Sequence, residues 1–130
     1  MTTLAKPAIK GFPTDPSTGK VGISLSAIKD GSGLIVTITD GQQISPYDSA
    51  FLMLGSDREN PEWKSSWAER AEMGEGGGPE EDPKLKTGVT LTLPKQYLTT
   101  YKDKEVQLRY VTRGESGLNN FSEPITLKVQ

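Results

Sequence analysis

The residue types that most often perform catalysis are missing from this chain. Its 130 residues include neither histidine nor cysteine, which excludes Ser-His-Asp and Cys-His catalysis, most zinc sites and the commonest general base. The remaining cluster of chemically useful groups is the carboxylate run Glu80, Glu81 and Asp82, and carboxylate oxygens are ligands that hard cations prefer. A solvated acidic loop is the simpler interpretation, because no EF-hand spacing surrounds these residues. We therefore expect no metal, no cofactor and no enzymatic activity.

Aromatic and cationic side chains offer binding chemistry instead. Trp63 and Trp67 are the only two tryptophans of the chain, and tryptophan and arginine are enriched at interface hot spots. Exposed indoles with Arg70 beside them would contact a sugar ring or a partner protein, and Tyr47 is a weaker candidate for ligand binding. The competing interpretation is that both indoles bury apolar area and fix this segment on the domain.

Further cations fall into two groups. The first lies beside the tryptophans and would add polar contacts to a binding surface; it consists of Arg58 and Lys64. The second lies on or just before the outward face of a strand expected at 105–113; it consists of Lys102, Lys104, Arg109 and Arg113. A solvated strand face explains the second group. The alternative is a basic patch that meets the acidic loop of a neighbouring copy, which would give weak self-association that salt disrupts.

Short strands must position these residues. In EVQLRYVTR at 105–113, Val106, Leu108 and Tyr110 alternate with residues of the opposite face, the period of a half-buried strand. Similar patterns, separated by turn clusters, predict strands at 21–26, 33–39, 88–94 and 121–130, and a strand buried on both faces at 49–55. Residues 4–12, with prolines nearby, are expected to form an edge strand or an extended lead-in. About seven such strands predict an all-β fold: an immunoglobulin-like antiparallel sandwich of two sheets with a long irregular insert at 57–83.

Two segments lack this alternation. Residues 60–74 suit a short helix, with Asn60 as its cap and both tryptophans on one face. They also suit an edge strand or irregular crossover, in which Trp63 and Trp67 occupy alternate positions. We favour the edge strand or crossover and leave the helix open. Residues 95–104 are expected to form the corner between the sheets. There Tyr97, Leu98 or Tyr101 would plug the core, and Tyr101 would serve as a tyrosine corner bonded to nearby backbone.

Composition and charge set outer limits on function. The net charge of -2 argues against nucleic acid as a main partner, and the length suits one domain spanning 1–130. No apolar run approaches the roughly 20 residues of a membrane helix, and the first residues lack the apolar region of a secretory signal. The location stays open between the cytoplasm and export without a cleaved leader, as does membership of a larger protein.

Three stretches carry a family resemblance: LAKPAI at 4–9, PYDSAFLMLG at 46–55, and the closing run VTLTLPKQYL, VQLRYVTR and FSEPITLKV between 89 and 129. With them the chain resembles bacterial immunoglobulin-like modules, especially those found in tandem in large proteobacterial surface and adhesin-type proteins. The shared residues are core and turn residues across most of 4–130, so the resemblance implies a fold and no activity. The insert at 57–83 departs from the family pattern and argues against a purely spacer role.

These observations predict a non-catalytic binding or structural module that contacts a protein or a carbohydrate. The alternative is a small secreted effector or toxin-like protein that acts on a receptor or a membrane. The residues expected to bind are Trp63, Trp67, Arg70 and Tyr47.

Overall fold

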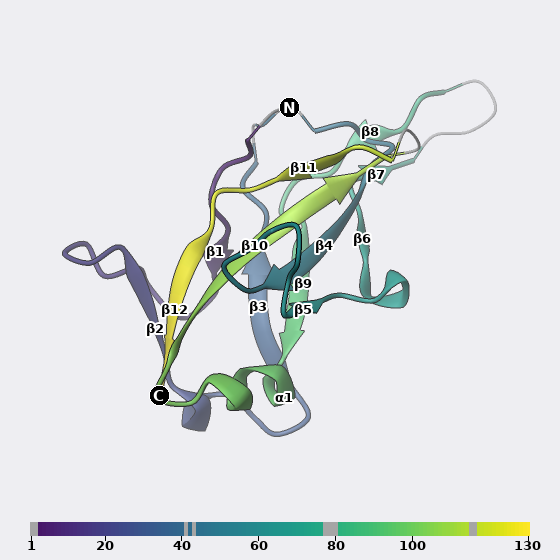
Figure 1. Cartoon of the computed structure of the whole chain (residues 1–130). Coiled ribbons are helices and arrows are strands. Elements are labelled where there is room, and N and C mark those ends of the chain that lie inside the picture. Colours follow the sequence, from purple (N-terminus) through teal and green to yellow (C-terminus); the bar gives the residue numbers. More distant parts are fainter. Residues whose placement is uncertain (1–2, 41, 43, 77–80, 115–116) are drawn as a thin grey trace.

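The computed structural model describes residues 3–40, 42, 44–76, 81–114 and 117–130, and most of its regular structure is β-strand (Figure 1). The strands in this part of the chain are β1 (Ala8–Ile9), β2 (Lys20–Ile23), β3 (Gly33–Thr37), β4 (Ser49–Leu54), β5 (Trp63–Lys64), β6 (Ala71–Glu72), β7 (Gly74–Glu75), β8 (Lys84–Leu85), β9 (Thr90–Pro94), β10 (Glu105–Arg113), β11 (Asn119–Phe121) and β12 (Ile125–Val129). Helical structure in the same residues consists of α1 (Lys95–Leu98) and the 3-10 turns Leu25–Ala27, Trp67–Glu69 and Thr99–Tyr101. The expected all-β fold is confirmed.

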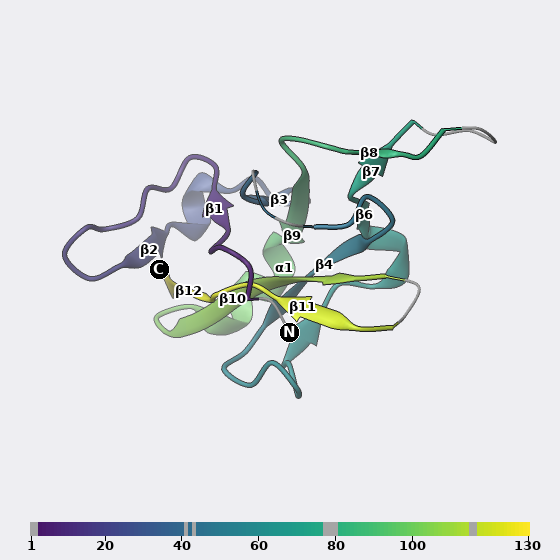
Figure 2. The same cartoon turned by 90° about the horizontal axis from the view of Figure 1, so that it is seen from above.

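Two sheets lie on either side of an apolar core (Figure 2). The smaller sheet has the antiparallel order β1-β3-β9. The larger sheet has the order β2-β12-β10-β4-β5, with β11 also paired to β10 and β6 also paired to β4. A separate hairpin of β7 and β8 projects from one end of the molecule (Figure 1).

The centre of the larger sheet is the pair β4 and β10, which runs in register from Leu54 opposite Leu108 to Ser49 opposite Arg113. Every residue of β4 is buried, as the continuous apolar run predicted. Its alternate residues belong to two different clusters, because successive side chains of a strand point to opposite faces. Leu52 belongs to the main core between the sheets, whereas Phe51 belongs to a second cluster on the outer face of the large sheet.

The larger sheet differs from the expected antiparallel arrangement at one edge. There β2 pairs in parallel with β12, from Lys20 opposite Thr126 to Ile23 opposite Val129. The closing segment also forms two strands rather than one, because the ladder is interrupted after β11. The amide of Glu123 donates to the carbonyl of Leu4 at 2.8 Å, and the next residue, Pro124, has no amide to donate.

The insert at 57–83 is more regular than expected, because three strands begin within it: β5 and β6 pair with β4, and β7 pairs with β8. Residues 60–74 follow the edge-strand interpretation, with a single 3-10 turn in place of the helix. The turn is capped at Ser66, whose amide donates to Glu69 Oε1 at 2.9 Å. Asn60 does not cap it, because its side chain bonds Asp57 in the preceding turn.

The segment 95–104 forms the predicted corner, and Leu98 plugs the core there with no exposed surface. The expected tyrosine corner at Tyr101 is wrong, because its hydroxyl donates to Glu62 Oε1 at 3.1 Å rather than to nearby backbone. The fully buried tyrosine is Tyr110, whose hydroxyl donates to the Ala5 carbonyl at 2.7 Å and fixes the first segment on the core.

Candidate functional site

The outer face of the large sheet carries a second apolar cluster. It consists of Phe51, Met53, Val111 and Phe121, each of which is at most 5% exposed. These residues lie on β4, β10 and β11, on the opposite face from the main core. Burial on this face requires a cover, and the segment that leads from β4 through β5 to the 3-10 turn Trp67–Glu69 supplies much of it.

The cover is made of cations placed over aromatic rings. The Arg58 guanidinium lies 4.9 Å from the ring centroid of Phe121, and Lys64 Nζ lies 5.2 Å from that of Phe51. The Arg70 guanidinium lies 4.0 Å from the ring of Trp67. Each contact is within the range of a cation–π interaction, worth about 0.5–1 kcal/mol at an exposed site. We call this surface the cation–aromatic face and define it by Phe51, Arg58, Lys64, Trp67, Arg70, Arg113 and Phe121.

A hollow of ≈ 270 Å³ lies in this face, and its lining consists of Phe51, Lys64, Ser65, Trp67 and Arg113. Backbone pairing and one buried side chain hold it in place. The amide of Ser65 donates to the Leu52 carbonyl at 2.9 Å, and the Leu52 amide donates back to Ser65 Oγ at 2.9 Å. The backbone at Lys64, directly before Ser65, and at Trp67, two positions after it, is thereby held close to β4.

The two cations that line the hollow, Lys64 and Arg113, have no acidic partner among the described residues. The carboxylates beside the other cations are engaged: Glu59 Oε1 lies 3.6 Å from Arg58 Nε, and Glu72 Oε1 lies 2.7 Å from Arg70 Nε. In the part of the chain that the structure describes, no carboxylate lies within ion-pair distance of Lys64 or Arg113. The hollow therefore carries an excess of positive charge.

The guanidinium of Arg109 lies under this face and corrects an expectation. We expected a solvated side chain on β10, but Arg109 is only 7% exposed. It donates weakly, to the Gly55 carbonyl at 3.4 Å and to Gln107 Oε1 at 3.3 Å. Burial lowers the pKa of this guanidinium, the nearby Arg58 lowers it further, and Asp57 opposes the shift. Because an arginine keeps its charge in proteins, Arg109 adds positive potential from beneath the surface.

The structure brings two of the four predicted binding residues together. Trp67 is 65% exposed and carries the guanidinium of Arg70 on its ring, and it also contacts Phe51 at a centroid distance of 6.0 Å. The two tryptophans do not share a surface, contrary to both interpretations of 60–74. Trp63 packs against the main core, with its ring 4.8 Å from that of Tyr97.

Tyr47, the fourth predicted residue, lies in the connection before β4. Its side chain is 55% exposed, and its hydroxyl donates to Asp82 Oδ1 at 2.8 Å. Asp82 belongs to the acidic run of Glu80, Glu81 and Asp82. Glu80 lies outside the described residues, as do residues 77–79 before it. Within the described segments, no three acidic side chains gather in a way that could hold a metal ion.

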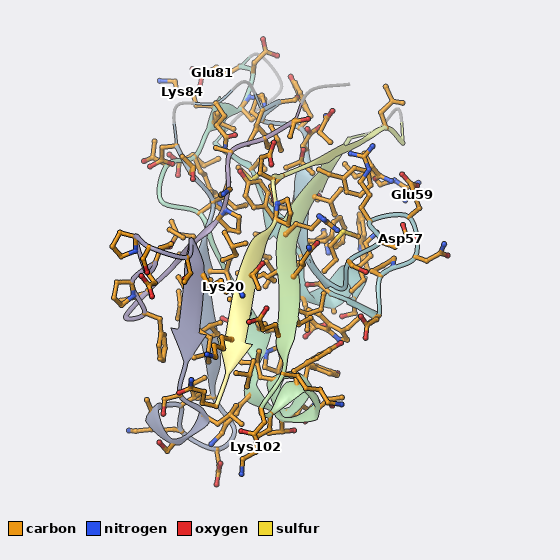
Figure 3. The ribbon with its side chains drawn as sticks, turned by 60° about the vertical axis from the view of Figure 1, so that its left-hand side comes forward. Lys20, Asp57, Glu59, Glu81, Lys84 and Lys102 are labelled. Carbon is orange, nitrogen blue, oxygen red and sulfur yellow. The ribbon has the colours of Figure 1, made fainter. Side chains whose placement is uncertain are left out.

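The exposed charges are spread over opposite ends of the molecule (Figure 3). Glu81 and Lys84, on the arm that includes β8, lie at one end, and Lys102 of the corner lies at the other; Asp57 and Glu59 project from the loop between β4 and β5. Arg113 ends β10 with an exposed side chain, as expected. Lys102 and Glu81 of one copy thus lie at opposite ends of the molecule.

Sequence reasoning missed the aromatic floor of the site. The sequence places Phe51 and Phe121 in predicted strands and does not indicate which face of the sheet each one occupies. The signal was present in the continuous apolar run at 49–55, because a strand buried on both faces needs a cover on each. A segment rich in tryptophan and basic residues, directly after that strand, is a natural cover.

Comparisons with known proteins do not identify a relative: no protein-family model, no curated protein and no solved structure matches this chain. In the described part of the chain, no helix has the length and apolar character needed to cross a membrane.

Proposed function

We propose that this chain is an immunoglobulin-like, non-catalytic binding module of one domain, which contacts a protein or carbohydrate partner through the cation–aromatic face. One observation carries the proposal. The three cation–π contacts of the described residues all lie on this outer face, and two of them involve the exposed indole of Trp67 or its neighbour Phe51.

Strand order supports the immunoglobulin-like part of the proposal. In such sandwiches the first, second and fifth strands share one sheet, and the third, sixth and seventh share the other. Here β1, β3 and β9 form the small sheet, while β4, β10 and β12 form the centre of the large sheet. On this assignment β5 is a short extra strand at the edge beyond β4, and β2 continues the first strand beside β12.

The composition of the cover supports a binding role rather than a purely structural one. Aliphatic side chains alone would bury Phe51 and Phe121 and leave little exposed. Instead the cover presents a tryptophan that is 65% exposed, next to two cations without an acidic partner in the described segments. Aromatic and arginine side chains in this setting are the usual anchors of protein interfaces.

A matched pair of variants tests the proposal. Wild-type protein, Trp67→Ala and Tyr47→Ala would each be applied to a glycan array and to immobilised candidate proteins, and the affinity of every hit measured. Both substitutions remove an exposed aromatic side chain, but only the first alters the cation–aromatic face. We expect Trp67→Ala to weaken binding by at least about thirtyfold, the effect of losing a hot spot of ~2 kcal/mol, and Tyr47→Ala to change it little. Equal losses in both variants, or no change in Trp67→Ala, would contradict the proposal.

A further inference from the structure

We propose that the hollow in the cation–aromatic face binds a carboxylate side chain of an acidic peptide segment in a partner protein, with Lys64 and Arg113 as its charged contacts. This inference rests on the proposed binding function and specifies its ligand. The hollow lies between the exposed indole of Trp67 and the buried ring of Phe51.

Charge complementarity is the first argument. Lys64 and Arg113 come from different strands, β5 and β10, yet line the same hollow. Neither has an ion-pair partner among the described residues, whereas Arg58 and Arg70 do. An incoming carboxylate would accept hydrogen bonds from both without displacing an internal acid, and charge-assisted bonds of this kind are roughly twice as strong as neutral ones.

Preorganisation is the second argument. Arg113 lies opposite Ser49 in the β4–β10 ladder, and Lys64 lies opposite Met53 in the β4–β5 ladder. Lys64 Nζ is further placed by its contact with the Phe51 ring, at 5.2 Å from the centroid. Because both backbones are tied to β4, a ligand has to order only the two side chains and not the backbone that carries them.

The environment of Trp67 favours an acidic peptide over a neutral sugar. A sugar ring that stacks needs a free aromatic face, but the Arg70 guanidinium already lies 4.0 Å over the indole. The neighbouring Phe51 ring lies at 6.0 Å from the indole and is tilted by 35°, and Phe51 is itself 5% exposed. The hollow of ≈ 270 Å³ is also slightly below the roughly 300–1,000 Å³ of sites for drug-sized ligands. It suits one side chain that enters end-on.

The surrounding charges strengthen the preference for an anion. The buried guanidinium of Arg109 lies under the same outer face, near Arg58. Of the acids in this region, Glu59 and Glu72 are paired with Arg58 and Arg70. Asp57 accepts from the Glu59 amide, and Glu69 accepts from the Ser66 amide. Positive potential from partly buried groups is screened less by salt than that of exposed ones, so it reaches an approaching carboxylate.

The test uses the whole chain and two short fluorescent peptides. One peptide alternates glutamate with alanine, and the other replaces each glutamate with glutamine. Anisotropy titrations would be made with wild-type protein, Lys64→Gln, Arg113→Gln and the control Lys20→Gln, an exposed lysine of β2 that pairs with Glu105. We expect only the acidic peptide to bind, a loss of about tenfold in each hollow variant, a change below about twofold in the control, and weaker binding at higher salt.

Several results would overturn the inference. The acidic peptide does not bind, or the glutamine peptide binds as tightly as the acidic one, or the affinity for the acidic peptide is unchanged in both Lys64→Gln and Arg113→Gln. Tighter binding of a uronic-acid oligosaccharide would assign the site to an acidic sugar instead. Self-association that salt and Lys64→Gln both abolish would assign it to the acidic segment of a second copy.

Failure of this inference is distinguishable from failure of the proposed function. If the double variant of Lys64 and Arg113 still binds a partner that Trp67→Ala loses, the cation–aromatic face is a binding surface for an uncharged ligand. If Trp67→Ala also binds normally, the face is not the binding surface. Thermal unfolding of each variant would confirm that the fold is intact, which we expect because Trp67 and Arg113 are exposed.

Discussion

The two faces of the large sheet are built from the same strands but closed by different chemistry. The inner face is covered by the small sheet, with aliphatic side chains such as Leu52 and Leu108 fully buried between the layers. The outer face buries a smaller cluster around Phe51 and Phe121, and cations on flexible stems form part of its cover. The inner face holds the fold together, while the outer face combines burial with exposed charge and an exposed indole.

Because of this difference, neighbouring residues of one strand contribute to different properties, one to the stability of the fold and the next to the binding surface. Adjacent residues of β4, such as Leu52 and Met53, belong to the two different faces. A substitution on the inner face should act on folding, because close-packed interiors tolerate little loss of volume. A substitution at the rim of the outer face should act on binding, because long polar side chains there can rearrange.

The largest expected effect compares Leu52→Ala with Met53→Ala. Leu52 has no exposed surface between the two sheets, and we expect its loss to reduce the free energy of unfolding by about 2–5 kcal/mol. Met53 is 3% exposed on the outer face, and we expect a loss below about 2 kcal/mol because its cover can collapse into the cavity. Urea unfolding measures both. A larger loss for Met53→Ala would contradict the comparison.

A smaller effect is expected at the residue that ties the cover to the sheet. Ser65→Ala removes the acceptor of the Leu52 amide, a hydrogen bond of 2.9 Å at a buried position. An amide left without a partner there should reduce the free energy of unfolding by about 1–3 kcal/mol. The same urea experiment measures it, with the exposed Ser24→Ala as control. Increased acrylamide quenching of Trp67 fluorescence, recorded with Trp63→Phe as background, would show that the cover has loosened.

The smallest effect concerns the carboxylate of Asp48, which directly precedes β4. Asp48 is 8% exposed, and burial raises the pKa of its carboxyl above the ordinary value. The folded state therefore retains this proton to a higher pH than the unfolded state does. Stability contributed by the protonated group is present below the unfolded pKa and is lost as the pH rises through the folded pKa.

Asp48→Asn removes this dependence and keeps the shape of the side chain. We expect the variant to gain stability relative to wild type as the pH rises from about 3 to about 7. Urea midpoints for the two proteins across this range measure the difference directly. A constant difference, or one that falls with rising pH, would show that Asp48 is not destabilised by burial.

The sequence predicted the strands well because their signal is local. Alternation in 105–113 and the continuous run at 49–55 correspond to β10 and to the doubly buried β4. The parallel pairing of β2 with β12 was not predictable from residues 20–23, because partner and direction depend on the packing of the whole sheet. The same holds for β5 and β6, whose two-residue lengths leave no periodic pattern.

The binding surface was predicted in part. Trp67 and Arg70 were identified from residue type and lie together, three positions apart around a 3-10 turn. Trp63 was assigned to the same surface, but its ring faces the core because β5 pairs it with Leu54. Arg109 was expected in solvent, and it is buried because the outer face of β10 is covered. Both errors concern the segment that packs over a strand, and local periodicity carries no information about that segment.

The two tryptophans offer the most direct measurement of the central claim. Each gives one indole N–H signal in a proton–nitrogen correlation spectrum, and they report on opposite faces of the large sheet. We predict that titration with the glutamate-containing peptide shifts the Trp67 indole and the amides of Lys64 and Arg113, and leaves the Trp63 indole unchanged. Larger shifts at Trp63, or shifts confined to the β7–β8 hairpin, would contradict the claim that the outer face is the binding surface.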